Sequence, residues 1–230
     1  MSALGSDALG SDASGSNVLR SVVTIDGPVA SGKSTVARLV AQHLAVPFVS
    51  SGLLYRAATF VALDSRCDSG APDEVLRELH EHDVQLLPDV EGNRLVIDER
   101  DMTEALHTHE VDAAVSAVAS HSQVRTWVNA RLREIDPPFV VEGRDMGTVV
   151  FPESEHKFYL TAPAAVRARR RLGERTADLE AVTAALHRRD EMDAGRLARA
   201  ADAQPIDTGG LNLEQVVDEI LRVLAGVRRE

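Results

Sequence analysis

The chain has 230 residues, of which 44% are hydrophobic and only 3% aromatic, and its formal net charge is −11. This length fits one α/β domain with room for a small insertion, and the negative charge argues against a surface that binds nucleic acid. Because the sequence has no run of about 18 apolar residues, and no basic segment followed by an apolar stretch at its start, we expect neither a membrane span nor a secretory signal. The single cysteine, Cys67, excludes an internal disulfide and suits a reducing cytoplasm, where we expect the protein to be located.

Residues 1–17 repeat the segment Leu-Gly-Ser-Asp-Ala and contain few apolar residues, which predicts a disordered tail ahead of one folded domain at 18–230. The domain opens with the run Val22-Val23-Thr24-Ile25, which is typical of a buried strand. Apolar residues at helical spacing from Val36 onward predict a helix soon afterwards. Between the two, residues 27–34 fit the phosphate-loop pattern G-x-x-x-x-G-K-[ST].

A strand, a glycine loop and a helix in this order form a site for anions. Successive backbone N–H groups point into one concavity, and the positive end of the helix dipole adds to the field. Gly27 and Gly32 allow a phosphate to approach the main chain closely. Lys33 would reach the β- and γ-phosphates of a nucleoside triphosphate, and Ser34 would offer its hydroxyl to Mg²⁺. The alternative is a chance glycine turn, and the register of lysine, hydroxyl and flanking elements argues against it.

The rest of the chain alternates between predicted strands and helices. We expect strands at 47–49, 139–141 and 157–160, and a β-hairpin at 83–98 with its turn at Glu91-Gly92-Asn93. Helical patterns follow Gly52, start again at Pro72, and then cover about 107–120, 122–135, 163–172 and 178–195. Asn212 and Gln215 form a capping pair for a last helix.

This alternation predicts an α/β fold in three layers, with helices on both faces of a central, mostly parallel sheet and with right-handed crossovers. In such sheets ligands collect at the carboxyl ends of the strands. Gly27 and Gly143 both fall at such ends, so we expect the binding site there.

A second polar group, Glu142-Gly143-Arg144-Asp145, directly follows the predicted strand at 139–141. Arginine can bind a phosphate through two parallel hydrogen bonds, and a carboxylate can accept one from an amino group. Arg56 makes a similar case after the second strand. Each has an ordinary alternative of equal weight: a turn with solvated charges at 142–145, and an exposed surface arginine at Arg56.

Residues 167–199 contain nine arginines against six acidic residues, within a chain that is strongly negative as a whole. Arg167, Arg170 and Arg171 share one face of a predicted helix, and Arg189 and Arg196 repeat the pattern on the next. With a phosphate loop present, we interpret the two helices as a flap that closes over polyphosphate, joined by a turn near Gly173. A solvated helical hairpin is the alternative. A grip on nucleic acid is disfavoured because no aromatic residues lie among the arginines.

Three runs of the sequence are informative together. They are Ile25-Asp26-Gly27-Pro28 with Gly32-Lys33-Ser34-Thr35, then Ser51-Gly52-x-x-Tyr55-Arg56, and then Glu142-Gly143-Arg144-Asp145-Met146-Gly147-Thr148-Val149-Val150-Phe151-Pro152. With Arg189-Asp190-x-x-Asp193-x-x-Arg196 and Ile206-Asp207-Thr208, they make the chain from about residue 20 to its end resemble bacterial cytidylate (CMP) kinases, which are phosphate-loop nucleoside monophosphate kinases. The run at 142–152 is highly specific, whereas the phosphate loop alone occurs in many families.

The resemblance implies transfer of the γ-phosphoryl group of ATP to CMP or dCMP, with Mg²⁺. It implies a core at 18–50, 104–166 and 200–230, a monophosphate-binding insertion with a small β-sheet at about 51–103, and an arginine-rich helical lid at about 167–190. ATP would be held by the lid arginine Arg170 and by the phosphate loop with the residue after it, namely Gly27, Pro28, Val29, Ala30, Ser31, Gly32, Lys33, Ser34 and Thr35.

The same resemblance implies a role for each residue around CMP. Arg56 and Arg144 match residues that bind its phosphate. Ser116, Arg189 and Asp193 match those near the ribose. The residues that match the surroundings of the cytosine ring are Ser51, Arg125, Asp145 and Arg196. The catalytic set would be Lys33, Arg144, Arg170 and Arg189, with Ser34 as the metal ligand.

Some positions depart from the family pattern. Ser50 stands where an aspartate is usual, Glu142 replaces a common aspartate, and the segments after Arg171 and after Arg196 are shortened. Two other kinds of function remain open: another small-molecule kinase acting on UMP, AMP or shikimate, and a nucleotide-hydrolysing ATPase or switch. A GTP switch is disfavoured because neither Lys33 nor Lys157 lies in an [NT]-K-x-D motif. We expect a monomer whose partners are CMP or dCMP and ATP, without nucleic acid or membrane.

Overall fold

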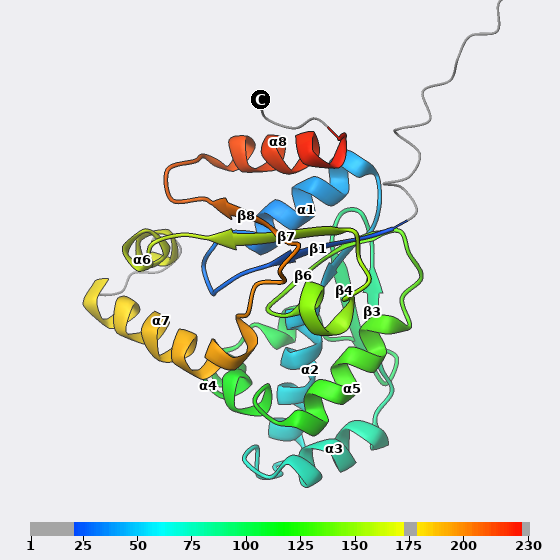
Figure 1. Ribbon diagram of the computed structural model, residues 1–230. Coiled ribbons are helices and arrows are strands. Elements are labelled where there is room, and N and C mark those ends of the chain that lie inside the picture. The colour runs from blue at the N-terminus through cyan, green and yellow to red at the C-terminus, as the bar shows by residue number, and fades with distance from the viewer. Residues whose placement is uncertain (1–20, 173–178, 227–230) are drawn as a thin grey trace, which may run out of the picture.

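The computed structural model describes residues 21–172 and 179–226, so the tail predicted at 1–17 and the turn expected near Gly173 lie outside the described residues. A parallel sheet of five strands lies at the centre, in the order β2-β6-β1-β7-β8. Helices cover both of its faces, which confirms the predicted three-layer α/β fold (Figure 1). The strands are β1 (Val22–Asp26), β2 (Phe48–Ser50), β6 (Phe139–Gly143), β7 (His156–Thr161) and β8 (Gln204–Asp207).

The sheet separates two hydrophobic cores, because its strands carry apolar residues on both faces. In β6, Val140 packs into one core, whereas Phe139 and Val141 pack into the other, as the alternation of side chains along a strand requires. Helices α1 and α8 complete the first core, and α2 and α5 contribute to the second. These helices are α1 (Lys33–Leu44), α2 (Ser51–Asp64), α5 (Ser122–Arg133) and α8 (Leu213–Leu224).

The helix starts follow the sequence signals. Asn212 Oδ1 accepts the N–H of Gln215 and Gln215 Oε1 accepts the N–H of Asn212, both at 2.9 Å, which confirms the predicted capping pair of α8. In contrast, α1 begins after Gly32 with no side-chain cap and no acidic residue in its first turn. The first N–H groups of α1 are therefore left for another acceptor.

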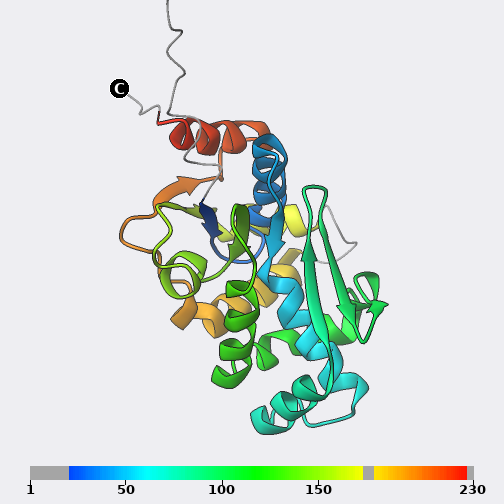
Figure 2. The same cartoon turned by 90° about the vertical axis from the view of Figure 1, so that its right-hand side faces the viewer.

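Between β2 and β6 the chain forms an insertion beside the main sheet. Strands β3 and β4 are the predicted hairpin, and in its turn Asp89 N donates to Gly92 O at 2.7 Å. The hairpin covers the outer edge of β2, because Phe48 N donates to Asp89 O at 3.0 Å and Ser50 N to Asn93 Oδ1 at 3.1 Å (Figure 2). Besides α2, the elements between β2 and α5 are α3 (Pro72–Glu81), β3 (Val84–Pro88), β4 (Asn93–Ile97), β5 (Arg100–Asp101), the short 3₁₀ helix η2 (Glu104–Leu106) and α4 (His109–Val118).

Two helices after β7 carry the arginine-rich segment, and we call them the arginine-rich helices: α6 (Ala164–Leu172) and α7 (Leu179–Asp193). Val29 of the phosphate loop packs between them against Ala168 and Leu186. Arg167 is buried, pairs with Asp190 at 2.6 Å and donates to Val29 O at 3.1 Å. The prediction that Arg167 lies on a phosphate-binding face is therefore wrong, because its guanidinium instead joins the two arginine-rich helices to the phosphate loop. A short 3₁₀ helix, η4 (Ala194–Arg196), follows α7.

Strand β8 and the turn after β6 are among the elements that were not expected from the sequence pattern. Strand β8 contains Pro205 and only one buried residue, Ile206, and it lies at the edge of the sheet, where proline is tolerated. After β6 the chain forms one turn of π-helix, η3 (Met146–Val150). None of the described helices is long and apolar enough to cross a membrane.

Candidate active site

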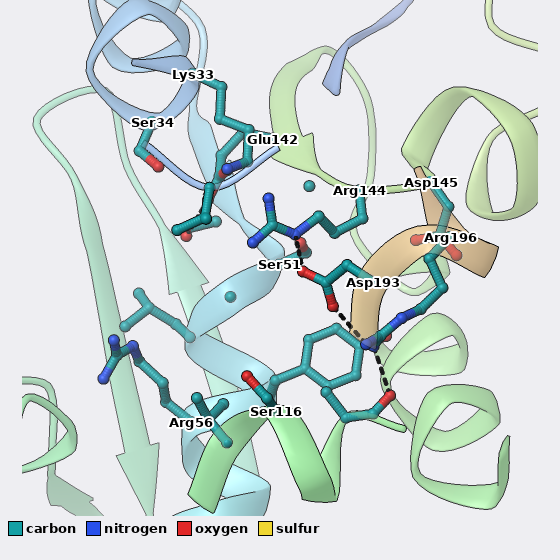
Figure 3. Close-up of a pocket in the computed structure, with 18 of the residues that line it drawn as sticks. Lys33, Ser34, Ser51, Arg56, Ser116, Glu142, Arg144, Asp145, Asp193 and Arg196 are labelled. Carbon is teal, nitrogen blue, oxygen red and sulfur yellow. Dashed lines mark hydrogen bonds and ion pairs between the residues drawn. The ribbon is translucent and has the colours of Figure 1, made fainter. Parts of the chain in front are cut away.

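A cavity of about 470 Å³ opens at the carboxyl ends of β1, β2 and β6, as the fold class predicts. Figure 3 shows Lys33 and Ser34 at one side of it and Arg56 and Ser116 at another, with Arg144 between them. All nine residues that the family resemblance assigned to the acceptor line this one cavity: Ser51, Arg56, Ser116, Arg125, Arg144, Asp145, Arg189, Asp193 and Arg196. Of the predicted ATP site, Val29, Lys33 and Ser34 line the same cavity.

The phosphate loop has the backbone geometry that its glycines predict. Gly27 has φ of 154°, and a Cβ there would lie 2.3 Å from the carbonyl oxygen of Leu160. Gly32 has φ of 90° and immediately precedes α1. Because α1 has no side-chain cap, this end of the helix presents free N–H groups and the positive end of its dipole to a phosphate.

Arg170, expected over ATP, does not line the cavity. Its guanidinium donates to Thr208 O at 2.6 Å and to Thr208 Oγ1 at 2.9 Å, and a longer bond of 3.3 Å reaches Ser31 O. The side chain thus joins α6 to the main chain of the phosphate loop and to the residue after β8. In this arrangement Arg170 supports the shape of the loop.

Lys33 is largely buried at the side of the cavity nearest the phosphate loop. Its Nζ donates to Pro28 O at 3.4 Å and lies 3.8 Å from Glu142 Oε2. Burial and the charge of Arg144 lower the pKa of Lys33 to about 8, and Glu142 opposes this change. A phosphate placed here would favour the charged ammonium.

The turn after β6 is fixed by contacts with the start of the phosphate loop. Asp26, the last residue of β1, accepts the N–H of Met146 at 2.9 Å and the N–H of Gly147 at 2.8 Å. One residue later, Gly27 O accepts from Arg144 at 2.8 Å. The two sides of the cavity, one carrying Lys33 and the other Arg144, therefore share a single buried anchor.

Acidic side chains hold the arginines of the cavity. Asp193 accepts from Arg144 Nε at 3.0 Å and from Arg196 at 2.5 Å, so it joins the turn after β6 to η4 (Figure 3). Arg125 pairs with the buried Asp145. These pairs fix the guanidinium and carboxylate groups in the wall of the cavity.

Arg189 lies in a strongly positive part of the cavity. Burial and the neighbouring charges of Arg144 and Arg171 lower its pKa. Like charges gathered in a partly desolvated site favour binding of an anion that neutralises them. Arg56 lies on the side of the cavity opposite Lys33 (Figure 3). There it donates to Leu106 O at 2.9 Å and to Asp112 at 2.6 Å.

Several residues that also line the cavity had no role assigned from the sequence, among them Tyr55, Asn93 and Arg171. Arg171 belongs to the predicted basic face of α6, and this place on the helix was the sequence signal that could have identified it. The Tyr55 hydroxyl is buried with no hydrogen-bond partner among the described residues, and burial raises its pKa to about 12. Asn93 comes from the hairpin, and nothing local in the sequence places it beside β2.

The residues at the cavity suit a magnesium ion that is shared with a nucleotide. Within the described ranges no group of three or more His, Cys, Asp or Glu side chains could hold a metal by itself. Ser34 lines the cavity, and its hydroxyl is a protein oxygen that could bind such an ion. Mg²⁺ usually keeps several waters and binds one or two protein oxygens together with substrate phosphates, so this donor set fits.

Comparison with known proteins agrees with the geometry. The family profile described as cytidylate kinase matches residues 23–225. A cytidylate kinase of Thermus thermophilus is 56% identical over 92% of this chain and 100% of its own length, and that of Deinococcus radiodurans is 52% identical over 87% and 97%. A cytidylate kinase of Bacillus subtilis is 34% identical over 88% and 95%. A solved shikimate kinase from Bacteroides thetaiotaomicron, with 14% identity over 89% of this chain and 98% of its own, has a TM-score of only 0.44. The chain belongs to the cytidylate kinase family.

Proposed function

We propose that this protein transfers the γ-phosphoryl group of ATP to CMP and dCMP, with Mg²⁺. The observation that carries the proposal is that the phosphate-loop lysine and the nine expected acceptor residues line one cavity. A hydrolase needs a triphosphate site and a water. It does not need a second, arginine-lined site for a phosphate.

The chemistry needs positioning more than proton transfer. The attacking oxygen belongs to the phosphate of CMP, which is already anionic at neutral pH, so no general base is required. Catalysis would then rest on aligning the two phosphates and on neutralising the charge of the transferred group. Mg²⁺, when bound, would add positive charge at the phosphates of ATP, with Ser34 as its protein ligand.

Each part of the cavity has a role in this proposal. Lys33 and the N–H groups of the phosphate loop would hold the β- and γ-phosphates of ATP, and Arg170 would support that loop from α6. Arg144 and Arg189 lie close enough to Lys33 to lower its pKa, so they are placed to neutralise the group in transfer. Arg56 would bind the CMP phosphate with Arg144, after exchanging its present contact with Asp112 for the ligand.

The nucleoside of CMP would bind on the side of Arg144 that faces away from Lys33. Arg125 and Asp145, paired here, offer a donor and an acceptor to the edge of the cytosine ring. Ser51 and Arg196 would complete the base site. Asp193, with Ser116 and Arg189, would bind the ribose.

We further propose that the core at 18–50, 104–166 and 200–230 stays fixed while the insertion at 51–103 and the lid at 167–190 close around the two nucleotides. Closure would exclude water, which competes for the same phosphorus atom. The protein would act as a monomer in the cytoplasm, without nucleic acid or membrane.

The test is an assay of ADP release with CMP, dCMP, UMP, AMP or no acceptor. The proposal predicts release that depends on CMP or dCMP. Equal release without an acceptor would identify an ATPase, and a preference for UMP or AMP would move the function to another monophosphate kinase.

A further inference from the structure

Two side chains near the carboxyl ends of β2 and β6 form a chain of contacts that ends at Lys33. Ser50 and Glu142 are direct partners in the parallel pairing of β2 with β6. Ser50 Oγ donates to Glu142 Oε1 at 2.7 Å, and the other carboxylate oxygen lies 3.8 Å from Lys33 Nζ. All three residues line the cavity.

Glu142 is held on both sides rather than free to rotate. Its side chain is only 6% exposed, so a carboxylate here must be paired and hydrogen-bonded to be tolerated. Ser50 is fixed in turn, because its N–H donates to Asn93 Oδ1 at 3.1 Å. The contacts therefore run from the hairpin through β2 and β6 to the first residue of α1.

The surroundings explain why Lys33 needs such a partner. Arg144 and Arg189 both act on Lys33 as like charges. Without an opposing carboxylate their repulsion would move the flexible lysine side chain away from its place at the phosphate loop. Glu142 supplies the larger part of that negative charge and Asp26 adds to it. The Ser50 hydroxyl keeps the second oxygen of Glu142 turned toward Lys33.

We propose that Glu142, oriented by Ser50, is a positioning residue that holds the Lys33 ammonium in line with the phosphate loop. This inference rests on the proposed function for the identity of the acceptor, but not for the placement of Lys33. It also gives a meaning to two departures from the family pattern. Ser50 and Glu142, the two residues that depart from that pattern, are paired across β2 and β6 and joined by a hydrogen bond.

The test compares four variants with the wild type: Ser50→Ala, Glu142→Gln, Glu142→Ala and the double variant Ser50→Ala/Glu142→Ala. Glu142→Gln keeps the size and the bond to Ser50 but removes the charge. It is expected to lower kcat about tenfold or more, with the KM for CMP changed less than threefold, since a lost interaction with a charged group is worth about that factor. Ser50→Ala should lower kcat by a smaller factor, about threefold to tenfold. In the Glu142→Ala background it should have no further effect, because it acts through Glu142.

Ser154→Ala is the matched control. Ser154 Oγ also donates a hydrogen bond of 2.7 Å, to Val22 O, at the start of β1 and away from the cavity. It should lower the melting temperature about as much as Ser50→Ala and leave kcat unchanged. The affinity for ATP in the absence of Mg²⁺, measured by calorimetry, should be lower in Glu142→Gln than in the wild type, because Lys33 loses its fixed position.

The outcomes separate the two proposals. Wild-type protein that does not phosphorylate CMP refutes the proposed function, and the variants can still be compared by their ATP affinity. Glu142→Gln with wild-type kcat and ATP affinity overturns the positioning role. The positioning role is also overturned if Ser50→Ala lowers kcat further in the Glu142→Ala background. It is overturned as well if the Ser154→Ala control loses as much kcat as Ser50→Ala does.

Discussion

Replacing Asp26 with asparagine would remove a buried charge from the anchor that joins the two sides of the cavity. Asp26 is 6% exposed, and its two oxygens accept the N–H groups of Met146 and Gly147. Asparagine keeps the shape and one acceptor, but its amide nitrogen would face one of these N–H groups. That unsatisfied donor should cost about 1–3 kcal/mol at every pH.

The charge itself adds a part that depends on pH. Burial raises the pKa of Asp26 from 3.8 to about 6, against the lowering effect of the two N–H bonds, while the charges of Asp145 and Glu142 raise it further. The folded state therefore binds the proton more tightly than the unfolded state. This stabilisation is fully present below pH 3.8 and is lost as the pH rises through about 6. From pH 5 to pH 7.5 the loss is about 1.4 kcal/mol.

The measurement is urea unfolding of the wild type and of Asp26→Asn at several values between pH 5 and pH 8. The difference in unfolding free energy, wild type minus variant, should fall by about 1.4 kcal/mol between pH 5 and pH 7.5, because the variant has no group to titrate there. Taking the difference removes the contribution of groups that the two proteins share. A difference that is constant with pH, or that grows as the pH rises, would refute the reasoning about Asp26.

Three further substitutions test the site. Lys33→Ala should reduce turnover at least about a hundredfold while the protein still folds, because it removes a charge placed for the transferred group. A kcat near that of the wild type would count against the site. Asp145→Ala should raise the KM for CMP about tenfold and leave the KM for ATP within about twofold, since Asp145 lies on the acceptor side; equal losses for both nucleotides would remove its role in reading the base. Gly143→Ala should destabilise the fold by about 1–3 kcal/mol in urea unfolding, because the new Cβ would lie 2.7 Å from both Met146 Cγ and Ser51 Oγ. Gly92→Ala is its control, with nothing within 4 Å, and an equal cost there would show that the crowding at Gly143 is not the cause.

The elements that could be predicted are those whose signal is local. The β-branched run of β1, the glycines before α1 and the turn of the hairpin each carry their own pattern within a few residues. Strand β8 has no such pattern, because it is an edge strand with Pro205 and one buried residue. The π-helical turn at Met146–Val150 depends on Asp26, which lies about 120 residues earlier in the chain.

The same division holds for the site. The residue types of the cavity could be assigned through the family resemblance, but how they pair could not. Arg167 and Arg170 have the same chemistry and helical spacing as Arg171, yet only Arg171 lines the cavity. The difference arises from distant partners, Asp190 for Arg167 and Thr208 for Arg170, which no periodicity along α6 reveals.

The central claim is that a phosphoryl group passes from ATP to CMP within one cavity. Tracing a labelled γ-phosphate of ATP into the products tests this claim most directly. ATP carrying radioactive phosphorus in its γ-position would be incubated with the protein, Mg²⁺ and CMP, and the products separated. The account predicts that the label appears in CDP, one phosphate for each ADP formed, and that Lys33→Ala forms none. Label recovered only as inorganic phosphate, or CDP formation that survives Lys33→Ala, would contradict it.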